Sequence, residues 1–247
     1  MIRLILTVLF IVIFLILSIP VFLVEWLLGK WKPQLKDRSS LAIVSWAFRV
    51  VMLCSGVKTT YIGDENIPTD EAVLFVANHR SFFDIVVNYA HFGKLKKLTG
   101  FISKKEVDKV PLFNIWMRNL HCVFLDRSSI REGMKMILSA IELVKSGISI
   151  FIFPEGTRSK EADAFLPFHE GSLKIAQKTG CAIIPVTINN SNAVLEDHFP
   201  FIKKTHVIVE YGKPVYVKDL PSEYQKQVGA YTQKLISETY FKNKELV

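Results

Sequence analysis

ISIFIFPEGTRS, at residues 148–159, decides the fold of this chain, because it joins an apolar strand to a polar loop. The apolar run Ile148–Phe153 has the length of a buried strand, and Pro154 ends it, since proline cannot donate a hydrogen bond to a central ladder. The loop then offers a carboxylate, a glycine that lets backbone approach a ligand, and an arginine that can hold an anion. The alternative interpretation of this string is an ordinary solvated turn.

Short apolar runs and longer amphipathic stretches alternate on both sides of this segment. We predict strands at Ala72–Ala77, Leu98–Ser103, Cys122–Leu125, Ser149–Phe153, Ala182–Ile188 and Val207–Tyr211. One buried helix face is predicted from apolar residues spaced by three and four, namely Ile130, Met134, Ile137, Ile141 and Val144. A second helix is expected within Ser222–Phe241, and Pro185 predicts an edge or a bulge in its strand. Strands separated by helices favour an α/β fold with a mostly parallel central sheet flanked by helices.

Polar side chains follow four of the predicted strands, at the point where each strand ends. In chain order these residues are His79, Lys104, Lys105, Arg127, Glu155 and Arg158. Because the carboxyl ends of parallel strands meet at one edge of a sheet, where open α/β sheets bind ligands, we predict a single site there. Strand alternation predicts that one of the two lysines faces this edge and the other faces solvent.

The segment Asn78-His79-Arg80-Ser81-Phe82-Phe83-Asp84 places a histidine five residues before an aspartate. Histidine can take a proton near neutral pH, and a carboxylate can orient its ring. In a continuous helix, five residues would turn Asp84 about 140° away from His79. His79 must therefore lie in the turn before the helix if the two side chains meet. The alternative is a capping box, in which Ser81 and Asp84 only cap the helix.

The N-terminal run Leu4–Val24 contains 21 residues without a charge, which is long enough to cross the hydrocarbon core of a membrane. The stretch Ser39–Val57 is also apolar, but Arg49 interrupts it, so an interfacial or half-inserted helix is expected there. We divide the chain into N-terminal membrane-associated helices, residues 1–58, and an α/β domain, residues 59–247. Whether the first segment spans the membrane or dips into one leaflet is left open.

Positive charge is concentrated beside this membrane segment. The 247-residue chain has a formal net charge of +8, and residues 30–58 contain six basic residues against one acid. Only Arg3 precedes the apolar run, so the charge balance predicts that the rest of the chain lies on the cytoplasmic side of the cell membrane. The same placement favours anionic lipid over nucleic acid as the partner.

Several common chemistries lack their sequence motifs. The chain has no glycine-rich phosphate loop, no dinucleotide fingerprint, no His-Glu-x-x-His pair and no Gly-x-Ser-x-Gly elbow. Its three cysteines are far apart and lack metal-ligand spacing, so neither a metal nor a cofactor is expected. No nucleophile stands beside His79, which favours direct attack by an activated substrate hydroxyl over a covalent enzyme intermediate.

In order and spacing, the motifs resemble those of the glycerolipid acyltransferases, most closely the 1-acylglycerol-3-phosphate acyltransferases. The matching strings are Asn78–Asp84, Phe124–Arg127, Phe153–Ser159 and Ile184–Val186, and the resemblance covers roughly residues 58–215. It implies the transfer of a fatty acyl group from an acyl thioester to the free hydroxyl of 1-acyl-sn-glycerol 3-phosphate, which makes phosphatidate for phospholipid biosynthesis. The thioester would be acyl-coenzyme A or acyl-acyl carrier protein.

The resemblance also implies a role for each motif residue. His79 would be the general base, and Asp84 would orient it. The residues that would bind the acceptor are Arg127, Glu155, Gly156, Thr157 and Arg158, with Lys104 or Lys105 assisting. Phe82, Phe83 and the apolar residues near 110–116 would line an acyl channel.

Two other functions stay open from the sequence. The first is acyl transfer to another lysophospholipid or to a lyso-amino-acid lipid, which a panel of acceptors would separate. The second is a non-catalytic membrane protein that binds anionic lipid, which leaves the spacing of His79 and Asp84 without an explanation.

Overall fold

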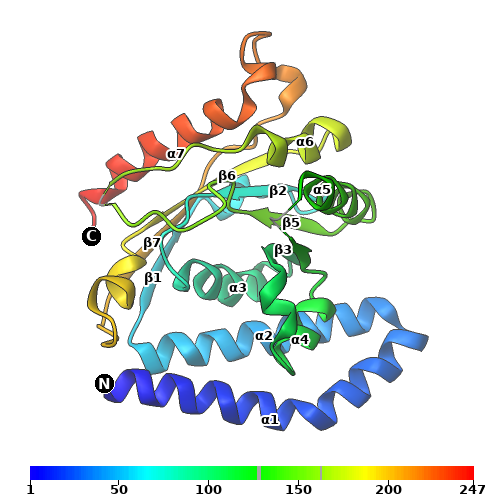
Figure 1. Cartoon of the computed structure of the whole chain (residues 1–247), viewed down its shortest axis with the longest axis vertical. Coiled ribbons are helices and arrows are strands. Elements are labelled where there is room, and N and C mark those ends of the chain that lie inside the picture. Colours follow the sequence, from blue (N-terminus) through cyan, green and yellow to red (C-terminus); the bar gives the residue numbers. More distant parts are fainter. Residues whose placement is uncertain (127–128, 162) are drawn as a thin grey trace.

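A computed structural model describes residues 1–126, 129–161 and 163–247, and a seven-stranded sheet in the order β1-β7-β6-β2-β5-β3-β4 forms its centre (Figure 1). The strands are β1 Lys58–Ile62, β2 Leu74–Ala77, β3 Thr99–Lys104, β4 Val123–Leu125, β5 Ser149–Ile152, β6 Ile183–Asn189 and β7 His206–Tyr211. The five strands from β6 to β4 are parallel, whereas β7 is antiparallel to β6 and parallel to β1. The predicted mostly parallel α/β sheet is therefore confirmed.

Two features of the sheet differ from a simple reading of the sequence. The edge strand β1 lies within residues 58–62, which we did not predict as a strand, because its side chains are only partly buried and give no apolar run. Pro185 lies in β6, which is an internal strand, so the edge alternative is wrong, and β6 itself pairs with β2 through Pro185 without a bulge; the extra residue lies opposite, in the partner segment 211–215. The pairing of β6 shifts by one residue between the bridge Ile183–Val215 and the pair Val186–Tyr211, on either side of Pro185.

Helices cover both faces of the sheet. They are α1 Ile2–Trp31, α2 Pro33–Ser55, α3 Phe83–Leu95, α4 Phe113–Asn119, α5 Ile130–Lys145, α6 Glu170–Thr179 and α7 Val228–Lys244. Helices α2 and α3 lie on one face, and α5, α6 and α7 lie on the other (Figure 1). Side chains of β2 alternate between the two cores, with Phe75 on the α3 side and Leu74 and Val76 on the α5 side.

The buried face of α5 is rotated from the predicted one. Met136, Ala140, Ile141 and Val144 are buried, but Met134 is 61% exposed, so its assignment to the core was wrong. Two residues along a helix turn by about 200°, so a core centred on Met136 leaves Met134 on the solvent side. The second predicted helix exists as α7, and it begins at Val228 rather than at residue 222.

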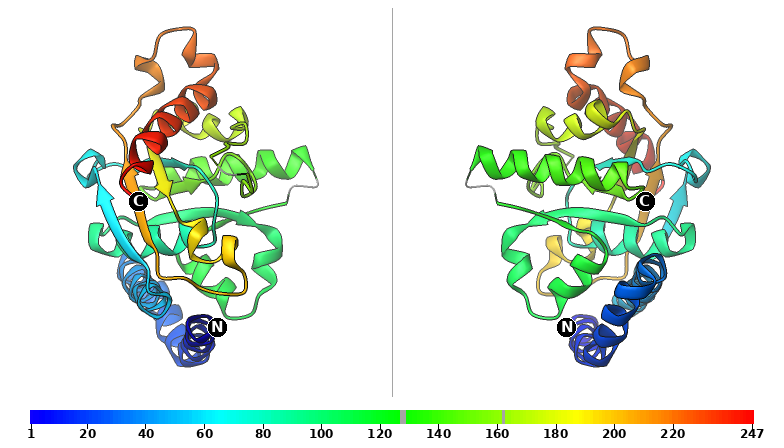
Figure 2. Two further views of the ribbon diagram at one scale, coloured as in Figure 1. Left: turned by 90° about the vertical axis from the view of Figure 1, so that its left-hand side faces the viewer. Right: turned by 90° about the vertical axis from the view of Figure 1, so that its right-hand side faces the viewer.

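Helices α1 and α2 form an antiparallel hairpin, with α2 on α3 and α1 outside α2 (Figures 1 and 2). In α1 the polar residues Thr7, Ser18 and Glu25 are buried, while most of the apolar side chains are exposed. Each buried polar group has a partner. The Oγ atoms of Thr7 and Ser55 lie 3.2 Å apart, the indole N–H of Trp116 donates to Ser18 (2.9 Å), and the hydroxyls of Ser39 and Ser40 donate to Glu25 (2.7 and 3.0 Å).

This inverted burial leaves an apolar outer surface on α1, which fits a membrane anchor. Both hairpin helices are long and apolar enough to cross a membrane by length and composition. Side chains of α2, among them Leu41, Val44 and Val51, also belong to the core beneath the sheet. The division of the chain at residue 58 and the cytoplasmic orientation stay predictions.

Candidate active site

The two motif segments hold each other at the ends of adjacent parallel strands. Segment 78–84 follows β2, and segment 153–159 follows β5, which pairs directly with β2. The backbone N–H of His79 donates to Oε1 of Glu155 (2.7 Å), and its carbonyl accepts from the N–H of Ser159 (2.9 Å). His79 is thus fixed on both sides of its Cα by the second segment, at the edge of the sheet that the sequence predicted.

The side chains of Asn78 and Arg80 anchor the turn around His79. The amide of Asn78 donates to the carbonyl of Ile188 and accepts from its N–H, both at 2.9 Å, which ties the turn to β6. The guanidinium of the buried Arg80 donates to the carbonyl of Glu161 (2.7 Å) and to the hydroxyl of Tyr240 in α7 (3.3 Å). The turn therefore has little freedom to move relative to the sheet.

His79 and Asp84 form a hydrogen-bonded pair. Nδ1 of His79 lies 2.9 Å from Oδ2 of Asp84, which is fully buried and also accepts the N–H groups of Arg80 (2.8 Å) and Ser81 (2.9 Å). Helix α3 begins at Phe83, so His79 lies in the turn before the helix, as the spacing required. A carboxylate partner assigns the ring proton to Nδ1 and leaves the lone pair on Nε2. Within the described part of the chain, no residue hydrogen-bonds Nε2 of His79.

The capping and catalytic interpretations of Asp84 turn out to be compatible. Oδ2 of Asp84 accepts the N–H of Ser81, and Oγ of Ser81 accepts the N–H of Phe83 (3.0 Å), which is close to the reciprocal pattern of a capping box. The same oxygen of Asp84 holds the imidazole of His79. The start of the helix is therefore also the device that orients the histidine.

Phe153 and Glu155 support the histidine from the second segment. The ring of Phe153 stacks on the imidazole of His79, with centroids 4.0 Å apart and an interplanar angle of 18°. Glu155 is 4% exposed, and its second oxygen accepts the N–H of Leu166 (3.0 Å). Burial raises the pKa of the Glu155 carboxyl. Both oxygens of Glu155 bond to backbone N–H groups, so its contacts favour support of the loop over contact with the acceptor.

Residues 156–158 of the second segment turn toward solvent, whereas Ser159 is buried. The N–H of Gly156 donates to the carbonyl of Phe153 (3.0 Å), and Gly156 has a φ of 72°, a left-handed conformation that favours glycine. Thr157 is exposed. The guanidinium of Arg158 lies 3.9 Å from the ring centroid of Phe82, and its Nη1 donates to Oε1 of Glu196 (2.9 Å).

Glu196 is a site residue that the sequence did not predict. It lies in a short 3₁₀ turn, Glu196–His198, in the loop after β6. Besides Arg158, its carboxylate accepts the hydroxyl of Ser81 (2.6 Å) and the N–H of Phe82 (2.8 Å). It therefore joins both motif segments. One acidic residue in a loop, beside Asp197 and outside any motif, gives no sequence signal of this position.

The lysines lie farther along the same edge of the sheet. Strand β3 is separated from β2 by β5, which places their ends about 10 Å apart. Lys104 is exposed, and Nζ of Lys105 donates to Asp126 (3.0 Å), a contact that raises the pKa of Lys105. The hydrogen bonds of the described residues join neither lysine to His79 or Arg158. Arg127 lies outside the described residues.

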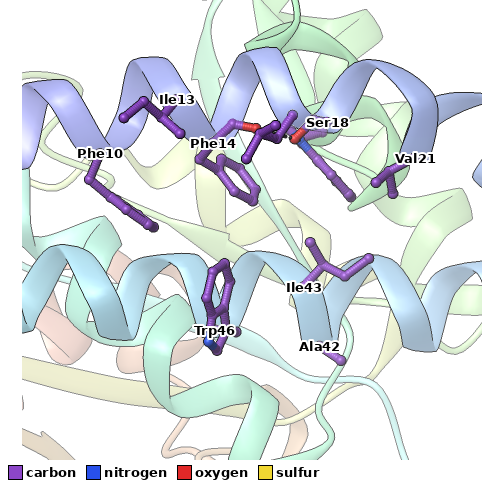
Figure 3. Close-up of a pocket in the computed structure, with 10 residues that line it drawn as sticks. Phe10, Ile13, Phe14, Ser18, Val21, Ala42, Ile43 and Trp46 are labelled. Carbon is purple, nitrogen blue, oxygen red and sulfur yellow. Dashed lines mark hydrogen bonds between the residues drawn. The ribbon is translucent and has the colours of Figure 1, made fainter.

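An apolar pocket lies away from these groups, between α1 and α2 (Figure 3). It has a volume of about 490 Å³, and Phe10, Phe14, Trp46 and Trp116 are among its aromatic lining residues. Of the residues expected in an acyl channel, Trp116 lines this pocket, and Phe82 and Phe83 do not. Across residues 1–126, 129–161 and 163–247, no cluster of His, Cys, Asp or Glu has the makings of a metal site.

Comparison with known proteins shows the family of this chain. The model of the Acyltransferase family matches residues 58–189, which include both motif segments. A 1-acyl-sn-glycerol-3-phosphate acyltransferase of Borreliella burgdorferi is 32% identical over 197 residues, which are 77% of this chain and 74% of that protein. The chain belongs to the acyltransferase family. A 1-acyl-sn-glycerol-3-phosphate acyltransferase of Saccharomyces cerevisiae is 27% identical over 190 residues, which are 76% of this acyltransferase and 60% of the yeast protein.

The fold of the acyltransferase also has a counterpart among solved structures. The crystal structure of the 1-acyl-sn-glycerophosphate acyltransferase PlsC from Thermotoga maritima superposes with a TM-score of 0.79. The match covers 97% of this chain and 96% of that one, at 24% identity. The N-terminal hairpin is included in so complete a match, so it is part of the shared fold.

Proposed function

We propose that this acyltransferase transfers a fatty acyl group from an acyl thioester to the free hydroxyl of 1-acyl-sn-glycerol 3-phosphate, which gives phosphatidate. The observation that carries the proposal is the bond between Nδ1 of His79 and the buried carboxylate of Asp84, which leaves Nε2 to accept a proton. The likeness to the Borreliella and yeast enzymes supports the choice of acceptor. Membrane attachment through α1 suits an acceptor whose own acyl chain stays in the bilayer.

In the proposed reaction, Nε2 of His79 takes the proton of the acceptor hydroxyl while the hydroxyl oxygen attacks the thioester carbonyl. The tetrahedral intermediate collapses, the carbon–sulfur bond breaks, and the imidazolium returns its proton to the departing thiolate. The carboxylate of Asp84 stabilises the transient positive charge on the ring. No covalent bond to the enzyme forms in this sequence.

Arg158 is the proposed binding group for the acceptor phosphate. A guanidinium has five N–H donors, and the bond to Glu196 uses one of the two terminal nitrogens. The side chain is 35% exposed, so its remaining donors can reach a ligand that enters from solvent or from the membrane surface. Holding the phosphate there would place the free hydroxyl near His79 and replace a chance encounter with a positioned one. Arg127, Lys104 and Lys105 are proposed as further cations along the same edge.

The test is an acyl-transfer assay on the purified full-length protein. Lysophosphatidate and phosphate-free monoacylglycerol would be crossed with acyl-coenzyme A and acyl-acyl carrier protein as donors. His79→Ala should abolish transfer, because the base is lost, and His206→Ala, which removes an exposed histidine, should leave it near wild type. Turnover by the His79 variant near that of wild type would refute the mechanism. Equal rates with and without the acceptor phosphate would refute the role of Arg158.

A further inference from the structure

The loop between β6 and β7, residues 190–205, presents two aromatic side chains to solvent. Phe199 is 75% exposed and Phe201 is 50% exposed. The loop itself is well packed, because its own residues Val194 and Ile202 are buried and the N–H of Lys203 donates to the carbonyl of Val194 (2.9 Å). A well-packed loop that keeps two phenyl rings in water indicates an interaction surface.

Basic residues surround the base of this loop. Lys203 and Lys204 are exposed, and the N–H of Lys58 in β1 donates to the carbonyl of Thr205 (3.0 Å). Arg3 of α1 is also close, since a Cβ built on Gly56 would lie 3.2 Å from its Nε and 3.5 Å from Cβ of Lys204. Phenyl rings beside several cations are the chemistry that fits the headgroup region of an anionic membrane.

The loop adjoins the apolar surface of α1. The contacts around Gly56 place Lys204 next to the first turn of α1, where Ile2 and Ile5 are 75% and 57% exposed. The ribbon views show the same arrangement, with the loop above the N-terminal end of α1 (Figures 1 and 2). An apolar helix and an aromatic loop on the same side of the molecule can contact one lipid surface together.

We propose that the β6–β7 loop is a second membrane contact, in which Phe199 and Phe201 enter the headgroup region of an anionic lipid surface beside α1. Glu196 lies three residues before Phe199 and bonds Arg158 and the start of α3, so the docked loop would hold the mouth of the site against the bilayer. A partner protein is the competing occupant, but continuity with the apolar face of α1 favours lipid. The inference rests on membrane attachment alone and does not depend on the acceptor.

An environment-sensitive fluorophore at position 199 tests the contact directly. Phe199→Cys would be labelled in full-length protein in which serine replaces Cys54, Cys122 and Cys181, and Leu138→Cys on α5, also an exposed apolar position, gives the matched control. In vesicles containing phosphatidylglycerol, the label at 199 should shift to the blue and be quenched by lipid-borne nitroxide, and the label at 138 should do neither. Equal emission and quenching at the two positions would overturn the proposal. Circular dichroism reports folding without reference to activity.

Hydrogen exchange of the unlabelled wild-type chain gives an independent measurement. In nanodiscs, peptides from residues 190–205 should exchange more slowly with phosphatidylglycerol than with phosphatidylcholine alone, and Lys203→Glu with Lys204→Glu should remove the difference. Each basic residue near an anionic surface strengthens membrane binding roughly fivefold, so the two lysines can slow the exchange by at most roughly thirtyfold. The matched reversal Lys174→Glu with Lys178→Glu on α6 should keep the slowing. Identical exchange in both lipids, or slowing that survives reversal at 203 and 204, would show that the loop does not dock on lipid.

Discussion

Replacement of Glu196 tests whether the unexpected third member of the site positions Arg158. Glu196→Ala removes the acceptor of the bond to Nη1 of Arg158 and leaves the stacking of the guanidinium on Phe82. An arginine side chain carries about 2 kcal/mol of rotamer entropy, and a cation–π contact at an exposed site restrains about 0.5–1 kcal/mol of it. We therefore expect about 1–1.5 kcal/mol of lost preorganisation, a rise in KM for lysophosphatidate of about fivefold to twelvefold.

The expected signature is a change in KM without a matching change in kcat. The hydrogen bonds of Glu196 go to Ser81, Phe82 and Arg158 and not to the His79–Asp84 pair, so kcat should stay within about threefold of wild type. Glu196→Gln keeps an oxygen for the N–H of Phe82 and for Arg158, removes the charge and replaces the oxygen that accepts from Ser81 by an amide NH2, so its KM should rise less. Asp197→Asn, one residue along the same loop, removes a charge whose carboxylate bonds Asn192 instead and should leave KM unchanged.

The assay is initial-rate kinetics with lysophosphatidate and with monoacylglycerol as acceptors, on variants matched for thermal stability. The rise in KM should occur only with the phosphate-bearing acceptor. Because Glu196 also bonds Ser81 and Phe82, the alanine variant should lose about 1–3 kcal/mol of stability, and a melting curve separates that loss from the kinetic effect. A lower kcat at unchanged KM, or the same rise with monoacylglycerol, would refute the positioning role.

Three further outcomes follow from the described contacts. Asp84→Asn keeps the size of the side chain but should lower kcat by about 10³- to 10⁴-fold, because the carboxylate that orients and stabilises the protonated His79 is lost; a rate within tenfold of wild type would contradict this. Burial lowers the pKa of His91 from 6.5, so at a pH below about 6.5 the unfolded chain protonates this histidine more readily than the folded chain does, and stability falls as the pH drops. His91→Gln should therefore flatten the dependence of Tm on pH in that range. An unchanged slope would show that His91 does not cause the dependence. Phe151→Ala should cost about 3–5 kcal/mol in urea unfolding, because the ring is fully buried and stacks on Phe101 at 4.4 Å; a cost under 1 kcal/mol would show that the core closes over the cavity.

The parts of the fold that could be predicted from the sequence are those in which one residue pattern is compatible with one local structure. Ile148–Phe153 is apolar because β5 is buried on both faces, and the arrest at Pro154 marks the edge where the site lies. The five-residue spacing of His79 and Asp84 predicted a turn before a helix, because no continuous helix could join them. Their catalytic roles stay predictions.

What the sequence missed depends on contacts between distant segments. The edge strand β1 has one neighbour, β7, which is almost 150 residues away, and its partly buried side chains give no apolar signal. Glu196 reaches the site only because the loop after β6 returns to the start of α3. The buried polar residues of α1 likewise hydrogen-bond to residues of α2 and α4, so no local pattern identifies them as the inner face of the helix.

His79, the proposed base, is held more rigidly than Arg158, the proposed phosphate-binding group, and this difference bears on specificity. His79 is bonded at its N–H and at its carbonyl, stacked on Phe153 and tied to a fully buried carboxylate, so its imidazole has one position. Arg158 is held by stacking and by one ion pair whose partners are 35% and 21% exposed, and solvent weakens such a pair. The hydroxyl to be acylated must therefore come to a fixed base, whereas Arg158 keeps its bond to Glu196 and can adjust its remaining donors to a phosphate or to another head group. Substitutions around Arg158 and Glu196 should consequently change which lysophospholipid is accepted, and substitutions around His79 should change the rate for all of them.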